Sequence, residues 1–237
     1  MALKLLHPEW KQAPIQGVLF DMDGVILDSE KLYTRFWQEA AQDLGYPMTR
    51  AQALGMRSLN REAGAAQLKR FLGASADYDA VRRRRIELMD AFVQENGIAA
   101  KPEIIPLLDA LDKVGIPAAI TTSSPLERVE AYLAPLGLLD RFQKICTGYQ
   151  VPHGKPEPDI YLFGAASLNL QPGVCLALED SAAGILSASR AGTLPVMIPD
   201  QDPPQPESDK LLYALADSLQ DVIGLLDKTP IPFPTEL

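Results

Sequence analysis

Two aspartates, Asp21 and Asp23, follow directly after a short apolar run that begins at Val18. A run of this length containing Val and Phe predicts a buried strand, and the Asp-x-Asp-Gly that follows predicts a turn at its carboxyl end. Two carboxylates at the end of a buried strand repel each other and lose solvation, so a cation or a positively charged transition state is needed to stabilise them. The alternative is a solvated Asx turn, in which each aspartate bonds only its own backbone. We favour a chemical site.

Four further apolar runs predict buried strands, and helical patterns separate each from the next. Strands that alternate with helices in this way form βαβ units, which predict a parallel sheet covered on both faces. The predicted strands are 117–121, 144–147, 174–178 and 194–198, and the helical patterns include 126–136 and 181–191, with a final helix at 211–226.

The residues that follow these strands form one chemical set. In an open parallel sheet, ligands bind beyond the carboxyl ends of the strands, so these residues are expected to face a common point. A small number of hard oxygen donors suits Mg²⁺, which keeps several waters and prefers a substrate phosphate to a full protein cage. The set consists of Asp21, Asp23, Thr122, Ser123, Ser124, His153, Gly154, Lys155, Glu179 and Asp180.

Sequence features next to Thr122 and Ser123 agree with a bound phosphate. The segment 124–127 has the pattern of a capping box with proline at the first helical position, so both hydroxyls are expected just before a helix N-terminus, which attracts anions. Lys155, in a proline-rich loop, can act as a point charge beside the phosphate. Taken singly, each residue has a plainer explanation. Thr122 could be a hydroxyl at a helix entry, Lys155 could be a surface lysine, and Glu179-Asp180 could cap a helix. Their shared place at the strand ends favours a site.

The composition excludes several classes of partner. The chain has 237 residues and a formal net charge of −9, which argues against nucleic acid and anionic membranes as partners. The first residues lack the apolar region of a signal peptide, and no later apolar run approaches membrane-spanning length, so we expect neither feature. The two cysteines, Cys146 and Cys175, lie in apolar runs without metal-ligand spacing, which predicts buried reduced thiols and a cytoplasmic protein.

The interval from Asp28 to about Pro102 contains no strand candidate, and it is far longer than a crossover helix needs. We therefore expect an inserted helical domain. Its helix signals are the capping candidates Asp28 and Ser29, a capping-box pattern at 49–52 and a long last helix at 77–94. The arginine run 82–85 in that helix points around the whole helix, so we expect a solvated face in preference to an anion site.

The motifs of the strand ends, taken together, are similar to the four motifs of haloacid dehalogenase (HAD) superfamily phosphatases of the β-phosphoglucomutase-like branch. They are Asp21-Met22-Asp23-Gly24-Val25, the motif at Thr122, the segment 154–159 and the segment 178–184. The resemblance implies an α/β fold with a Rossmann-like parallel sheet core, residues 1–28 and 102–237, and an inserted small α-helical cap domain, residues 29–101. It also implies Mg²⁺.

The resemblance implies a role for each matching residue. Asp21 would be the nucleophile that forms an aspartyl-phosphate, and Asp23 would be the general acid for the leaving alcohol and then the base for water. Mg²⁺ would be held by Asp21, the backbone carbonyl of Asp23 and Asp180, with Glu179 either a ligand or a residue behind the ligands. In dehalogenases of the superfamily no metal is used and the aspartate at position 23 is missing, so its presence favours phosphate chemistry.

Lys155 and the Thr122 hydroxyl would offset the remaining negative charge. Substrate choice is expected in the cap domain, where Arg57 lies at a position that relatives often use for substrate contact; the alternative is an exposed arginine on a helix turn. The chain has Tyr33 where the mutase has a histidine, and Pro125 where it has a lysine. Both departures favour hydrolysis over isomerisation.

The sequence thus predicts a cytoplasmic, monomeric, Mg²⁺-dependent phosphatase that acts on a small phosphorylated metabolite, a sugar or polyol phosphate. One alternative is a phosphomutase, which would need to protect the aspartyl-phosphate from water and to hold a second phosphate. Another is a catalytically inactive protein whose cap binds a partner, because a fold does not fix a function. The presence of Asp21, Asp23, Lys155 and Asp180 argues against the second alternative.

Overall fold

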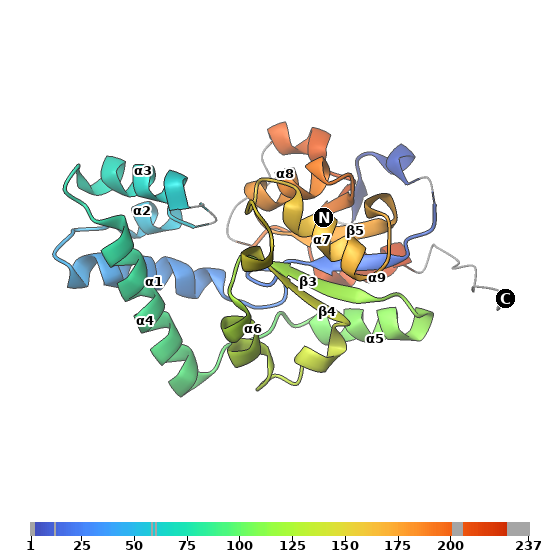
Figure 1. The fold of residues 1–237 in the computed structure, drawn as a ribbon, viewed down its shortest axis with the longest axis horizontal. Helices are drawn as coiled ribbons and strands as arrows, with labels where there is room; N and C mark the ends of the chain where they lie inside the picture. Colours follow the sequence, from blue (N-terminus) through green and yellow to red (C-terminus); the bar gives the residue numbers. More distant parts are fainter. Residues whose placement is uncertain (1–2, 12, 58, 60, 201–205, 227–237) are drawn as a thin grey trace. The chain divides into compact units, whose positions relative to one another are not determined.

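The chain folds into two compact units, seen in a computed structural model that describes residues 3–11, 13–57, 59, 61–200 and 206–226. The first unit comprises Met1–Leu27 and Ala100–Leu237, and the second comprises Asp28–Ala99. Figure 1 shows a sheet in the first unit and helices α1 to α4 in the second. We refer to them as the sheet unit and the helical unit.

A seven-stranded sheet forms the centre of the sheet unit, in the order β1-β7-β6-β5-β2-β3-β4. All neighbouring strands are parallel except β1 and β7, which pair antiparallel. Every residue of β2, β3, β5 and β6 is buried, which explains why these strands are almost continuously apolar. The strands are β1 (Lys4–Leu5), β2 (Gly17–Phe20), β3 (Ala118–Thr122), β4 (Lys144–Thr147), β5 (Cys175–Glu179), β6 (Leu194–Met197) and β7 (Ala214–Leu215).

The structure confirms the five predicted strands and differs from the prediction in the last predicted helix. The segment predicted as one helix, 211–226, is α-helical only from Leu219, and its earlier part contains β7. Hydrogen bonds from Tyr213 N to Pro195 O (2.8 Å) and from Ala216 N to Met197 O (2.9 Å) attach this segment to β6. Periodicity does not distinguish a two-residue strand from the first turn of an apolar helix, because partners distant in sequence decide which one forms.

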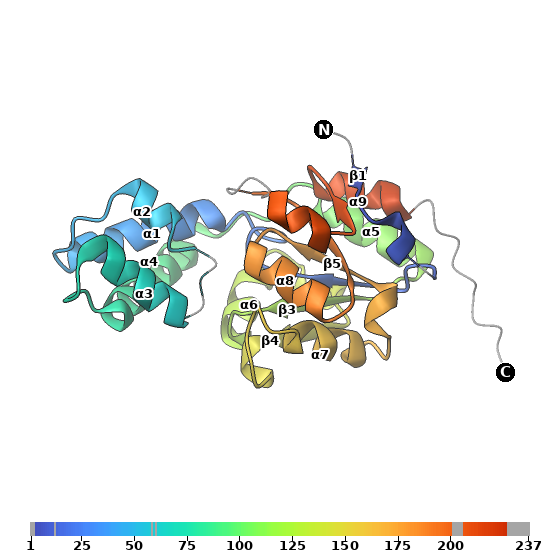
Figure 2. The same cartoon turned by 90° about the horizontal axis from the view of Figure 1, so that it is seen from above.

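Helices cover both faces of the sheet, as Figure 2 shows. On one face, α7 contacts β2, β3 and β4, while α8 contacts β5 and β6; α5 and α9 pack against each other on the opposite face. The helices of this unit are α5 (Ile104–Val114), α6 (Leu126–Leu133), α7 (Asp159–Ser167), α8 (Ala182–Arg190) and α9 (Leu219–Leu226). Short 3₁₀ segments occupy Pro8–Trp10, Leu139–Arg141, Gly148–Gln150, Pro172–Val174 and Pro206–Leu211.

The helical unit contains α1 (Glu30–Asp43), α2 (Arg50–Leu54), α3 (Arg61–Leu72) and α4 (Tyr78–Asn96), and the described part of residues 28–102 contains no strand. Helix α1 packs against α4 and α2 around a core of its own, which includes Trp37, Met48 and Leu68. The capping box predicted at 49–52 is confirmed. The predicted last helix also forms, and Asp77 caps it by accepting from Ala80 N at 3.0 Å.

The prediction of a solvated face for the arginine run 82–85 is wrong for Arg85, which is buried. Its guanidinium lies 4.8 Å from the centroid of the Tyr33 ring and 5.4 Å from that of Trp37, which are cation–π distances. Because consecutive residues point around a helix, one of the four had to face α1. Arg85 therefore contributes to the core of the helical unit.

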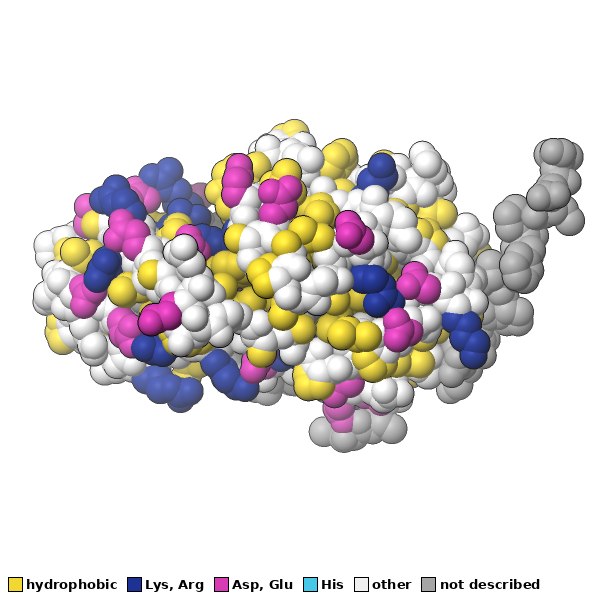
Figure 3. Space-filling view, turned by 90° about the horizontal axis from the view of Figure 1, so that it is seen from below, with side chains coloured by type: hydrophobic (Ala, Val, Ile, Leu, Met, Phe, Trp, Pro, Cys, Tyr) yellow, Lys and Arg dark blue, Asp and Glu magenta, His cyan; other side chains and the backbone are white. Residues whose placement is uncertain are grey.

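Both cysteines are buried free thiols, as predicted. Burial raises the pKa of the Cys175 thiol to about 12, so it stays protonated and unreactive at neutral pH. Figure 3 shows acidic and basic side chains interspersed among apolar and other polar groups on the face that it views. Within the described residues, no helix is both long and apolar enough to cross a membrane.

Candidate active site

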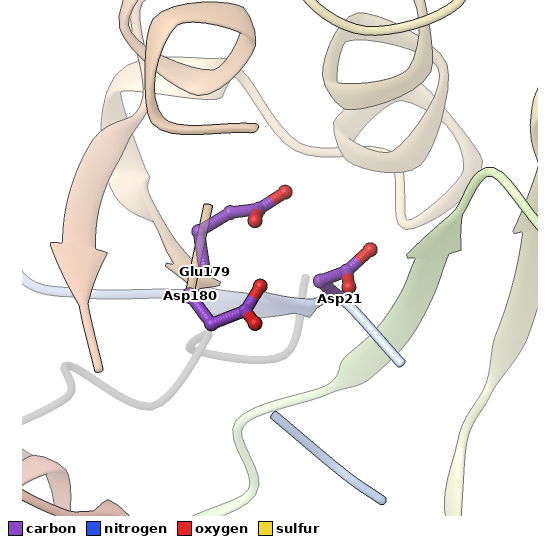
Figure 4. Close-up of side chains that lie close together, drawn as sticks. All are labelled: Asp21, Glu179 and Asp180. Atoms are coloured by element: carbon purple, nitrogen blue, oxygen red, sulfur yellow. The ribbon is translucent and has the colours of Figure 1, made fainter. Parts of the chain in front are cut away.

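The register of three central strands brings the acidic motifs to one edge of the sheet. Strand β2 lies between β3 and β5, and Phe20 pairs with Ile120 on one side and with Leu178 on the other. The next residue along each strand is therefore Asp21, Thr121 and Glu179, and all three stand at the carboxyl edge. Figure 4 shows Asp21, Glu179 and Asp180 close together at the ends of these strands.

Three buried carboxylates form a cluster at this edge. Asp21, Glu179 and Asp180 each offer an oxygen atom, and these atoms lie within 4.8 Å of one another. Mg²⁺ takes one or two carboxylates and completes its shell with water and substrate phosphate, so this cluster offers enough carboxylate oxygens for it. The side chains present therefore fit a divalent cation.

Lys155 connects two of these carboxylates. Its Nζ atom donates hydrogen bonds to Asp21 Oδ1 (2.5 Å), Glu179 Oε1 (2.6 Å) and the backbone oxygen of Thr121 (3.0 Å). Burial favours the neutral amine, but the carboxylates of Asp21 and Glu179 outweigh it and hold the pKa of Lys155 well above its usual value. Lys155 is therefore a permanent positive charge inside the cluster.

Asp21 has a strongly perturbed acidity. Burial raises the pKa of its carboxyl to about 8; the Lys155 ammonium opposes the rise, and the neighbouring carboxylates of Glu179 and Asp23 add to it. One ammonium thus does not compensate for the burial of these carboxylates. An ionised Asp21 at neutral pH requires further positive charge at this edge, which is the charge that a divalent cation would supply.

The loop that follows β3 differs from the prediction in one respect. The capping box predicted at 124–127 does not form: α6 begins at Leu126, and Pro125 precedes it without a side-chain cap. Pro125 has an extended backbone (φ −70°, ψ 157°), and the Ser124 hydroxyl donates to Asp23 Oδ2 at 3.1 Å. Thr122 is buried and its Oγ1 accepts from Ser124 N, while Ser123 is exposed.

Glu179 is held on both of its oxygens. Oε1 accepts from Lys155 and from the hydroxyl of Tyr161 (2.6 Å), and Oε2 accepts from the Ser181 hydroxyl (3.1 Å). Ser181 is also the N-cap of α8, where its Oγ accepts from Gly184 N. In the sequence, helix capping is the plainer explanation of Glu179 and Asp180; in the structure the capping side chain is that of Ser181. The contact of Tyr161 was missed, because a tyrosine in an apolar helical segment gives no signal of a distant partner.

Arg57 lies in the helical unit and forms an ion pair with Glu30, at 2.8 Å between Nη1 and Oε2. Both side chains are buried, so the alternative of an exposed arginine is wrong. The Nε atom of Arg57 also donates to the backbone oxygen of Leu54 at 3.2 Å. The contact of Arg57 with substrate stays a prediction.

The chain belongs to the haloacid dehalogenase-like hydrolases, whose family model matches residues 15–192. It is 35% identical over 205 residues to hexitol phosphatase A of Escherichia coli (84% of this chain, 91% of that protein) and 28% identical over 198 residues to the β-phosphoglucomutase of Bacillus subtilis (80% and 85%). A solved structure of CbbY from Rhodobacter sphaeroides in complex with phosphate matches with a TM-score of 0.69 at 28% identity, covering 86% of this chain and 95% of that one. These matches confirm the resemblance and the α/β fold.

The close approach of α8 to Glu179 gives a testable prediction. A Cβ atom at Gly184 would lie 1.9 Å from the Glu179 carboxyl, and overpacking of this kind costs about 1–3 kcal/mol. We therefore expect Gly184→Ala to lower the free energy of unfolding by that amount in urea titrations. The matched control is Gly224→Ala, whose Cβ meets nothing within 4 Å. Equal stability of the two variants would contradict the tight packing of Glu179 against α8.

Proposed function

We propose that this hydrolase is a Mg²⁺-dependent phosphatase that releases phosphate from a small phosphorylated metabolite, a sugar or polyol phosphate, through an aspartyl-phosphate on Asp21. The observation that carries the proposal is the position of Asp21, a buried carboxylate at the end of the central strand with Lys155 at 2.5 Å and two further carboxylates beside it. The name of the relative hexitol phosphatase A supports a phosphorylated polyol as substrate.

In the first step, a carboxylate oxygen of Asp21 attacks phosphorus, and the bond between phosphorus and the leaving alcohol oxygen breaks. The carboxyl of Asp23 gives its proton to that oxygen. In the second step, Asp23 takes a proton from water, the water oxygen attacks phosphorus, and Asp21 is released. Asp23 is suited to this work because its carboxylate is partly exposed and held by Ser124 at 3.1 Å.

The groups around Asp21 would bind and neutralise the phosphoryl group. Thr122 ends β3 and Ser123 follows it in the loop before α6; their hydroxyls would donate to phosphoryl oxygens, and Lys155 would balance part of the phosphoryl charge. Mg²⁺ would be held by Asp21, Asp180 and the backbone carbonyl of Asp23. When bound, it would supply the positive charge that in-line transfer of a phosphoryl group requires.

The place of Glu179 in this scheme is behind the metal ligands. Both of its oxygens already accept hydrogen bonds, from Lys155 and Tyr161 on one side and from Ser181 on the other. A carboxylate whose two oxygens accept these hydrogen bonds would orient the donor groups and leave metal binding to Asp21 and Asp180.

We further propose that the helical unit is the cap domain, residues 29–101, and that Arg57 there contacts the leaving group. We also expect a monomeric protein of the cytoplasm, where buried free thiols such as Cys146 and Cys175 stay reduced.

The second candidate function is a phosphomutase, because a β-phosphoglucomutase is among the relatives. Tyr33 and Pro125 replace the histidine and the lysine of the mutase, which favours hydrolysis. A product assay separates the two: a phosphatase releases inorganic phosphate from a sugar phosphate, whereas a mutase returns an isomer of the same phosphate.

The proposal predicts that Asp21→Asn abolishes turnover. The amide cannot form the acyl-phosphate, so the release of phosphate from an aryl phosphate with Mg²⁺ is expected to fall by several powers of ten. The matched control is Asp140→Asn at an exposed position, which is expected to keep wild-type activity. Activity of a folded Asp21→Asn protein within tenfold of wild type would exclude Asp21 as the nucleophile.

For Asp23→Asn we expect slower turnover with unchanged Mg²⁺ affinity, since the side chain moves protons and the proposed metal contact is the backbone carbonyl. Loss of a general acid–base typically costs about 10²- to 10⁴-fold in rate. Turnover of the aryl phosphate and Mg²⁺ binding by calorimetry measure the two quantities. A large loss of Mg²⁺ affinity would instead make the Asp23 carboxylate a ligand.

Arg57 gives a prediction with two readouts. Arg57→Ala leaves the buried carboxylate of Glu30 without this guanidinium, which is expected to cost about 3–5 kcal/mol of stability. It should also lower kcat/KM for a sugar phosphate while barely changing that for a small aryl phosphate. The control is Glu30→Gln, which removes one charge of the ion pair and keeps the guanidinium. Equal losses of kcat/KM on both substrates would contradict a contact with the leaving group.

A further inference from the structure

Tyr161 is a fully buried tyrosine of α7 that none of the proposed steps uses. Its hydroxyl donates to Glu179 Oε1 at 2.6 Å, and its ring centroid lies 5.2 Å from the Lys155 Nζ atom, within cation–π distance. A phenylalanine would fill the same space in the core. What the hydroxyl adds to the ring is its hydrogen bond to Glu179, because a buried phenol hydroxyl needs a polar partner.

The partner of Tyr161 is fixed from several sides. Glu179 has no exposed surface, and its Oε2 accepts from the Ser181 hydroxyl. The backbone of Gly184 lies so close that a Cβ there would overlap the carboxyl group. On the remaining side, Tyr161 and Lys155 share Oε1, at 2.6 Å each. The hydroxyl of Tyr161 therefore limits where Oε1 lies.

The position of Oε1 in turn sets the position of the Lys155 ammonium. An ammonium has three N–H donors, and those of Lys155 match three acceptors: Asp21 Oδ1, Glu179 Oε1 and the Thr121 carbonyl. Thr121 belongs to β3 and Asp21 directly follows the neighbouring β2, while the third acceptor is the carboxylate of Glu179, the last residue of β5, which Tyr161 holds. A displacement of Oε1 would therefore change the distance and angle between Lys155 and Asp21.

We propose that Tyr161 is a positioning residue that acts through Glu179: its hydroxyl holds the Glu179 carboxylate where that carboxylate directs Lys155 onto Asp21. The geometric part of this inference stands on the contacts alone, and its kinetic consequence rests on the proposed function. Loss of an outer hydrogen-bond partner at sites of this kind costs about 10- to 100-fold in activity.

The first measurement needs no turnover. In protein labelled with ¹⁵N-lysine, the resonance of the Lys155 ammonium, assigned by its loss in Lys155→Ala, is recorded for wild type and for Tyr161→Phe. We expect the variant to shift or broaden it. Tyr213→Phe is the matched control, because Tyr213 is also buried and its backbone bonds to Pro195 and Leu6, outside this site; it should leave the resonance unchanged. An unchanged resonance in a folded Tyr161→Phe protein would overturn the inference.

The second measurement is kinetic and uses an aryl phosphate. We expect Tyr161→Phe to lower kcat about 10- to 100-fold with KM nearly unchanged, and to have no further effect in a Glu179→Gln background, since it acts through Glu179. An unchanged kcat in active enzyme, or equal effects in both backgrounds, would overturn the positioning role. An inactive wild type with a shifted Lys155 resonance would refute the proposed function and leave the geometric inference supported.

Discussion

The structure of the site depends on the contact between the Lys155 ammonium and the Asp21 carboxyl, at a place where burial disfavours charge. Lys155 lies between two buried carboxylates, and removal of one partner from a buried ion pair typically costs about 3–5 kcal/mol. Burial also raises the pKa of Asp21 to about 8. The folded protein therefore binds this proton more tightly than the unfolded chain. As the pH rises from about 4 to about 8, the contribution of Asp21 to the free energy of unfolding falls.

The fold holds this arrangement because each charged group sits on rigid structure. Asp21 and Glu179 stand at the ends of adjacent strands, whose register pairs Phe20 with Leu178. Helix α8 begins at Ala182, and its N-cap Ser181 donates to the second oxygen of the Glu179 carboxylate. The free energy that keeps the carboxylates together therefore comes from the buried sheet and from the helices that cover it, at positions away from the chemistry.

The fold and much of the site could be predicted because they leave local signals. Buried strands read as apolar runs, and parallel strands place their carboxyl ends at one edge, so the grouping of Asp21, Lys155 and Glu179 followed from the order of the elements. The contacts that were not predicted depend on the direction in which a side chain points. Examples are the Tyr161 hydroxyl, the turn of Ser124 toward Asp23 and the burial of Arg85, each set by a partner far away in the sequence.

The most direct test of the account is to trap the covalent intermediate. Wild-type protein is mixed with Mg²⁺ and an aryl phosphate, quenched, and treated with borohydride, which reduces an aspartyl-phosphate to homoserine; peptide mass spectrometry then locates the change. The account predicts homoserine at position 21, dependent on substrate and absent when inorganic phosphate release has run to completion. Steady release of phosphate with no modification at Asp21, or modification at another carboxylate, would contradict it.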